Sequence, residues 1–234
     1  MKVIWIIVLV LAVVAGWFIV VPVVAPGVTE KTVVRDAQVT VGDTCAIMNQ
    51  SDLALMMYEN ALSANTSDTT ILKKKGALLI RCGRVSEAET VYQQVLSQTP
   101  NDTTALIKTG DSLARQGNLT GAIAYYNAAL ALNPSDATTL LKKGDAYLVM
   151  SMAETQRLQN IARNLSKQPG TSASPPATSA QSLDQMDSYQ QAMASYQKAM
   201  EIDPKLSVIV STRVLSASQN QVSSYQDILN NMGS

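Results

Sequence analysis

The side chains able to carry out chemistry in this chain are few and widely spaced. No histidine occurs among its 234 residues, which removes the commonest general base and metal ligand. Cys45 and Cys82 lack the C-x-x-C spacing typical of zinc and iron–sulfur ligands. The sequence therefore predicts no enzyme activity, no metal site and no cofactor. For the two cysteines, a disulfide in an exported domain and two buried apolar thiols are both open interpretations.

Three carboxylates share one local context, because Asp43, Asp111 and Asp145 each directly follow a glycine. One interpretation is a row of carboxylates on the inner face of successive helices. The other is an ordinary polar position that tolerates aspartate. The formal net charge is zero, so no broad basic surface is available for phosphates, and nucleic acid is not an expected partner.

The elements that position these side chains follow a fixed period. Gly42, Gly76, Gly110 and Gly144 are each separated by 34 residues. Alanine, tyrosine and proline keep the same step, at the positions Ala54, Ala88, Ala122, Tyr58, Tyr92, Tyr126, Pro100 and Pro134. A 34-residue period of this kind predicts helix–turn–helix units stacked on copies of themselves.

The pattern resembles the tetratricopeptide repeat family, most clearly over Thr69 to Asp136. The matching residues are Leu72, Gly76, Leu79, Gly83, Ala88, Tyr92, Pro100, Leu106, Gly110, Leu113, Gly117, Ala122, Tyr126 and Pro134. The resemblance implies an all-α solenoid of helical hairpins, with about four repeats and a C-terminal capping helix. The apolar N-terminal run described below adds one expected transmembrane helix before the solenoid.

Local chemistry supports this fold. The glycine of each first helix is expected to face an alanine of the second, while Tyr92 and Tyr126 fill the next space between helices. Gly83 and Gly117 are expected to end first helices in a left-handed conformation. The residues after each proline, such as Asp102 and Asp136, are expected to cap the next helix.

The predicted organisation begins with a signal anchor at residues 1–26 and an extended tether at 27–40, so that the first helix starts near residues 41–43. A degenerate repeat at 41–68 is followed by repeats at 69–102 and 103–136. A fourth repeat at 137–204 is expected to form a long hairpin with a disordered loop at 168–181. Residues 205–234 are expected to close the stack as a capping helix whose outer face is polar.

The segment from Val3 to Val24 contains 22 apolar residues without interruption. As a helix it would be ~33 Å long, enough to span a bilayer. We expect an uncleaved single-pass anchor, with a cleaved signal peptide as the alternative. Lys2 precedes the span, which favours a repeat domain outside the cytoplasm. Five Asn-X-Ser/Thr sequons suit this location, although turn composition also accounts for them.

The family resemblance implies a concave groove, lined by the first helices, that holds a segment of a partner protein. The residues expected to line it are Lys73, Ile80, Arg81, Ile107, Lys108, Asp111, Arg115, Leu141, Lys142 and Asp145. Its lysines and arginines would suit an acidic segment or a C-terminal carboxylate.

Two functions follow from this organisation. The first is a membrane-anchored module that mediates protein–protein interaction through the groove. The alternative is a structural protein of the cell envelope surface that associates with copies of itself. The sequence leaves the partner and the oligomeric state open.

Overall fold

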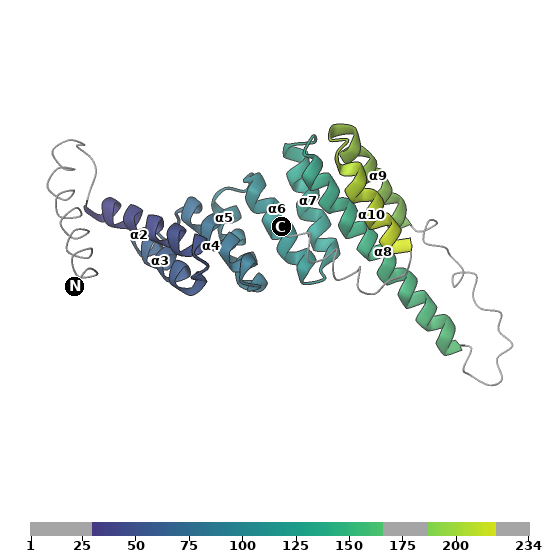
Figure 1. Ribbon diagram of the computed structural model, residues 1–234, viewed down its shortest axis with the longest axis horizontal. Helices are drawn as coiled ribbons and strands as arrows, with labels where there is room; N and C mark the ends of the chain where they lie inside the picture. The colour runs from purple at the N-terminus through teal and green to yellow at the C-terminus, as the bar shows by residue number, and fades with distance from the viewer. Residues whose placement is uncertain (1–29, 166–186, 219–234) are drawn as a thin grey trace. The chain divides into compact units, whose positions relative to one another are not determined.

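The computed structural model describes residues 30–165 and 187–218, and these residues form helices and turns without any strand. Figure 1 shows the helices along the chain. Their bounds are α2 (Glu30–Ile47), α3 (Ser51–Ala64), α4 (Thr69–Arg81), α5 (Val85–Gln98), α6 (Thr103–Arg115), α7 (Leu119–Leu132), α8 (Ala137–Leu165), α9 (Asp187–Ile202) and α10 (Leu206–Ser218). Helices α4 and α6 begin where the 34-residue period places the repeat starts.

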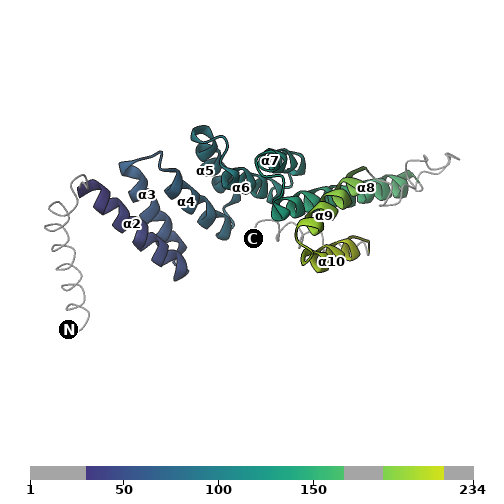
Figure 2. The same cartoon turned by 90° about the horizontal axis from the view of Figure 1, so that it is seen from above.

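The chain divides into two compact units, residues 1–78 and 79–234. In the first unit α2 packs against α3, as Figure 2 shows. Tyr58 of α3 is 3% exposed and lies against Gly42 of α2, where an added Cβ would come within 2.8 Å of the ring. This contact holds the two helices at close range.

The first helix begins earlier than the sequence predicts, because α2 starts at Glu30 instead of near residues 41–43. The expected tether at 27–40 is therefore wrong for its described part. The β-branched residues near Val33 lower helix propensity only slightly, and packing outweighs that preference. An ion pair of 3.6 Å from Arg35 to Asp68, just before α4, also fixes the early part of α2.

The second unit is a run of packed helix pairs. Helix α6 contacts α5 and α7, α7 contacts α8, α8 pairs with α9, and α10 packs on both α8 and α9. One apolar core extends from Leu113 on α6 to Ala217 on α10. Its largest fully buried side chains include Tyr126 and Tyr196. The long helix α8 thus belongs to the same core as the helices before and after it.

Turn chemistry repeats with the period, as predicted. Gly83 and Gly117 follow first helices with φ of 75° and 81°, which is the left-handed conformation. Asp102 caps α6 by accepting a hydrogen bond of 2.9 Å from the Ala105 amide. Asp136 accepts in the same way from the Thr138 and Thr139 amides at the start of α8.

The helix glycines face tyrosine rings instead of the alanines expected from sequence. A Cβ at Gly110 would lie 2.6 Å from the Tyr126 ring, and one at Gly144 would lie 2.5 Å from the Tyr196 ring. Each pair joins the two helices of one repeat. The ring occupies the space that a side chain at the glycine would need, so the glycine and the tyrosine are one packing feature.

Several predicted segments lie outside the described residues, namely the span Val3–Val24, the loop 168–181 and the end of the capping segment. Among the residues that are described, no helix combines the length and apolar character needed to cross a membrane. The part of the capping segment that is described, α10, differs from expectation. Its outer side exposes Val208, Ile209 and Leu215, so that side is not wholly polar.

Candidate functional site

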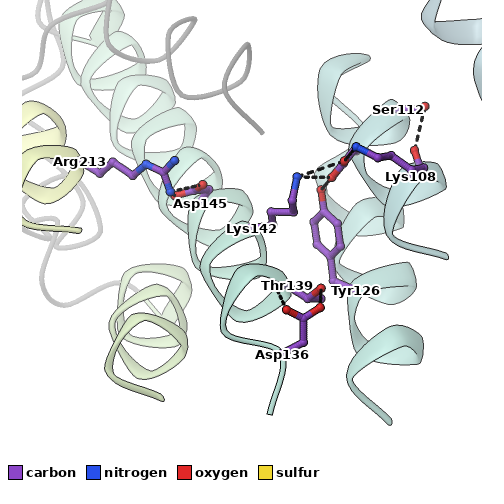
Figure 3. A network of polar contacts seen from close by, with 9 residues as sticks. Lys108, Ser112, Tyr126, Asp136, Thr139, Lys142, Asp145 and Arg213 are labelled. Atoms are coloured by element: carbon purple, nitrogen blue, oxygen red, sulfur yellow. Dashed lines mark hydrogen bonds and ion pairs between the residues drawn. The ribbon is translucent and has the colours of Figure 1, made fainter. Parts of the chain in front are cut away.

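One polar cluster of the second unit joins three helices through a single carboxylate. Asp111 of α6 is fully buried and accepts a hydrogen bond of 3.0 Å from the Tyr126 hydroxyl of α7. Lys142 of α8 donates to both of its oxygens at 3.1 Å, and Lys108 lies 3.4 Å away (Figure 3). The two helices of one repeat, α6 and α7, and the first helix of the next, α8, therefore meet at Asp111.

The same arrangement occurs twice more. Asp145 accepts from the Tyr196 hydroxyl at 2.7 Å and from Arg213 of α10 at 2.5 and 2.6 Å. In the other unit, Asp43 accepts from the Tyr58 hydroxyl at 2.8 Å and from Lys74 at 2.5 Å. We call these three groups the Asp–Tyr–cation clusters. Each cluster fixes the distance between one hairpin and the helix that follows it.

Sequence reasoning singled out the three aspartates, but it overlooked Lys74 and Arg213 and missed that the members of each cluster bind each other. The signal was present, because tyrosine follows aspartate by 15 residues and lysine by 31 in both the Asp43 and the Asp111 clusters. Ala77 occupies the aspartate position of the intervening repeat. Lys108, 31 residues later, bonds to Asp111 of its own helix instead.

Burial and ion pairing act on these groups in opposite directions. The pKa of Asp145 is raised to about 6, because the effect of burial outweighs the opposing effects of Arg213 and Tyr196. At Asp43, burial acts in the same sense but hydrogen bonds from Lys74 and Tyr58 outweigh it, so the pKa is below its usual value. Burial lowers the pKa of Lys142, and Asp111 opposes that change. Asp111 therefore helps to keep the buried Lys142 protonated.

These contacts decide which predicted groove residues a partner can reach. Asp111 and Asp145 are 0% and 1% exposed, so these two members of the expected inner row of carboxylates lie inside the protein. The third, Asp43, keeps a side-chain exposure of 39%. Ile80, Leu141 and Lys142 are also buried. The predicted residues that retain exposure are Lys73, which belongs to the first unit, and Arg81, Ile107, Lys108 and Arg115, which belong to the second.

The predicted groove residues of the second unit that keep exposure define, with the exposed Thr104, a surface that we call the first-helix face. It consists of Arg81 of α4 and Thr104, Ile107, Lys108 and Arg115 of α6. On α6 the four residues are separated by one, three, four, seven, eight or eleven positions, and they therefore lie on one side of the helix. Arg115 Nη1 donates to the backbone oxygen of Ile80 at 3.4 Å, which places α6 beside the last turn of α4. Lys142 of α8 links that helix to α6 by donating to the Asp111 carboxylate.

The charged side chains of this face are all cations, namely Arg81, Lys108 and Arg115. Lys108 and Lys142 both lie within ion-pair distance of the single Asp111 carboxylate, at 3.4 and 3.1 Å. No other acidic residue occurs in α6. The chemistry available at the surface is therefore that of a lysine and arginine face beside the apolar Ile107.

The cysteines do not form a disulfide in the described structure. Cys45 and Cys82 are both free thiols, with Cys45 buried and Cys82 exposed. The expectation of a buried thiol holds for Cys45 only. Cys82 lies between α4 and α5, in the turn that contains Gly83.

Comparison with known proteins identifies the repeats. Residues 73–137 and 178–206 match family models described as tetratricopeptide repeat. No curated protein matches the chain. The chain therefore contains tetratricopeptide repeats, a unit that generally mediates protein–protein interaction and typically serves as a scaffold and not as an enzyme.

Solved structures share the fold at low sequence identity. MamA from Desulfovibrio magneticus RS-1 is 15% identical, with 74% of this chain and 77% of that chain covered and a TM-score of 0.53. A second MamA structure is 20% identical, with coverage of 74% and 93% and a TM-score of 0.50. YrrB, described as a TPR protein with an unusual peptide-binding site, is 19% identical, with coverage of 73% and 69% and a TM-score of 0.51. At these identities the likeness shows the fold alone.

Proposed function

We propose that this chain is a membrane-anchored tetratricopeptide-repeat module that holds an acidic segment of a partner protein on the first-helix face. The observation that carries the proposal is that Arg81, Ile107, Lys108 and Arg115 keep exposure on this face, while Asp111, the one acidic residue of α6, is buried. Carboxylates are the natural partners of such a face, since charge-assisted hydrogen bonds to lysine and arginine are the strong ones. The peptide-binding site named for YrrB is consistent with this use of the fold.

The binding face is testable by site-specific cross-linking in cells that produce the full chain. A photoreactive amino acid at Thr104, which is exposed and has no side-chain bond to lose, is expected to capture a partner. The same amino acid at the exposed Asn127 of α7 serves as the matched control and should capture far less. The cross-linked peptide should be rich in Asp and Glu. Equal capture at both positions, or a peptide without acidic residues, would contradict the proposal.

Charge variants extend the same experiment. Replacing Arg81 and Lys108 by glutamine removes two cations from the face while the buried Lys142 stays in place. Each charge-assisted contact is worth about 1.5 kcal/mol or more, so the affinity for the captured peptide should fall at least about tenfold. Lys205→Gln removes one exposed charge elsewhere and should leave the affinity unchanged. A dissociation constant that is the same in all three proteins would move the binding surface away from α6.

The anchor and its orientation form the second part of the proposal. The apolar run from Val3 to Val24, with Lys2 before it, supports one span with the repeats outside the cytoplasm. Protease added to intact cells should therefore remove a C-terminal tag from the full chain. A variant that lacks residues 3–24 should keep its tag until the cells are lysed. Protection of the full chain in intact cells would reverse the proposed orientation.

A further inference from the structure

Helix α10 is apolar on two opposite sides, and the structure covers only one of them. Val210 and Ala217 are 4% and 1% exposed, and Leu206 and Val214 pack against the core beside them. On the other side Val208, Ile209 and Leu215 are 70%, 43% and 59% exposed. A helix that is apolar all round is typically buried all round. A terminal cap would instead present polar residues to water.

The contacts of α10 are those of a first helix and not of a cap. Arg213 bonds to Asp145 of α8 just as Lys142 of α8 bonds to Asp111 of α6. Helix α10 also has 13 residues, the same length as α4 and α6. In both of those repeats a three-residue turn leads directly into a second helix that packs on the first. The sequence after α10 can therefore be compared with a second helix.

Residues 219–234 carry the apolar spacing of such a helix. Val222, Tyr225, Ile228, Leu229 and Met232 follow the same intervals as Val85, Ala88, Val91, Tyr92 and Val95 of α5. Four of those five α5 residues are buried. Residues 219–221 would form the turn, with the same length as the turn between α4 and α5. The opposite side of the segment is Ser, Gln, Asn and Asp.

We propose that residues 222–232 form the second helix of a final hairpin and dock on the side of α10 defined by Val208, Ile209 and Leu215. The hairpin completes a fifth repeat unit and buries the side of α10 that the described residues leave open. Its polar side, made of Ser, Gln, Asn and Asp, then faces water. Because that side of α10 is occupied from within the chain, partner proteins are left with the first-helix face.

The test measures the accessibility of Leu215→Cys in the full-length chain, in a Cys82→Ser background that removes the exposed native thiol. The thiol at 215 should react with a maleimide about tenfold or more slowly than one introduced at Ala131, an exposed residue of α7. Its rate should be independent of protein concentration, because the covering segment belongs to the same chain. A rate equal to that at Ala131 would overturn the proposal.

Charge insertion into the segment separates this occupant from others. Leu229→Asp and, independently, Tyr225→Asp place a carboxylate on the apolar side and should raise the labelling rate at position 215 to that at Ala131. Asn230→Asp adds the same charge on the polar side of the segment and should leave position 215 protected. Protection that survives both apolar-side variants would overturn the proposal. So would protection that is lost on dilution, which would identify a second copy of the chain as the occupant.

Discussion

Asp111→Asn is expected to lower the free energy of unfolding of the 79–234 unit by about 3–5 kcal/mol, the usual cost of removing one partner from a buried ion pair. The substitution keeps the size of the side chain and an oxygen that can accept from Tyr126. It removes the charge that neutralises Lys142, whose side chain is only 9% exposed. Urea unfolding followed by circular dichroism measures the loss. Asp187→Asn, at an exposed carboxylate of α9, should change stability by less than about 0.5 kcal/mol.

The pH dependence of this loss has a definite sign. Burial lowers the pKa of Lys142 below that of an unfolded lysine, and Asp111 opposes the change. Without Asp111 the pKa falls further, so the unfolded chain binds more protons than the folded one over a wider alkaline range. Stability of Asp111→Asn should therefore recover as pH rises, because the folded state no longer holds a buried charge. A loss that grows with pH would contradict this explanation.

A double substitution shows whether the cost comes from the charge that is left behind. Lys142→Met replaces the buried ammonium by an apolar chain of similar length. Combined with Asp111→Asn it should restore most of the lost stability, because replacing both members of a buried pair is often close to neutral. The coupling between the two sites should be about 1–3 kcal/mol. Additive losses in the double variant would show that the Asp–Tyr–cation cluster does not act as a unit.

The sequence predicts the features that depend on local chemistry. Gly83 needs a left-handed backbone and Asp102 needs only the amides of its own helix, so both are recognisable without knowledge of the packing. Local chemistry does not predict which side of α6 a neighbouring helix covers. Asp111 has the right spacing for an inner surface, but its burial depends on Tyr126 and on Lys142, which is 31 residues away. Spacing places residues on a helix side, and only packing decides whether that side meets water.

The two ends of the described chain illustrate the same limit. Propensity around Val33 argues for a late start of α2, and packing on α3 together with Arg35 and Asp68 overrides it. At α10, the apolar stripe that contains Val210 is recognisable from its spacing and is buried as expected. The residues of the second apolar side, which includes Val208, are interspersed with serines and threonines in the sequence. It becomes evident only when the helices that cover the first side are known.

Tyr196→Ala should lower the free energy of unfolding of the same unit by about 3–5 kcal/mol, the usual cost of removing a buried aromatic ring. Tyr196 is fully buried against Gly144, and its hydroxyl donates to Asp145. The loss combines a cavity with a missing hydrogen bond to a buried carboxylate. Urea unfolding provides the measurement. Gln197→Ala, at the exposed neighbouring position, should stay within about 0.5 kcal/mol of the native chain.

The effect of Gly144→Ala on the free energy of unfolding is expected to change sign when the Tyr196 ring is removed. In the native chain, Gly144→Ala places a Cβ 2.5 Å from the Tyr196 ring, and such overpacking should cost about 1–3 kcal/mol. In the Tyr196→Ala background the ring is absent, so the same substitution should stabilise the protein by up to about 1 kcal/mol, since alanine favours helix over glycine. Destabilisation in both backgrounds would mean that glycine is required at position 144 for another reason. A reversal would show that position 144 is glycine because the Tyr196 ring needs the space, as the rings at Gly42 and Gly110 do in their own repeats.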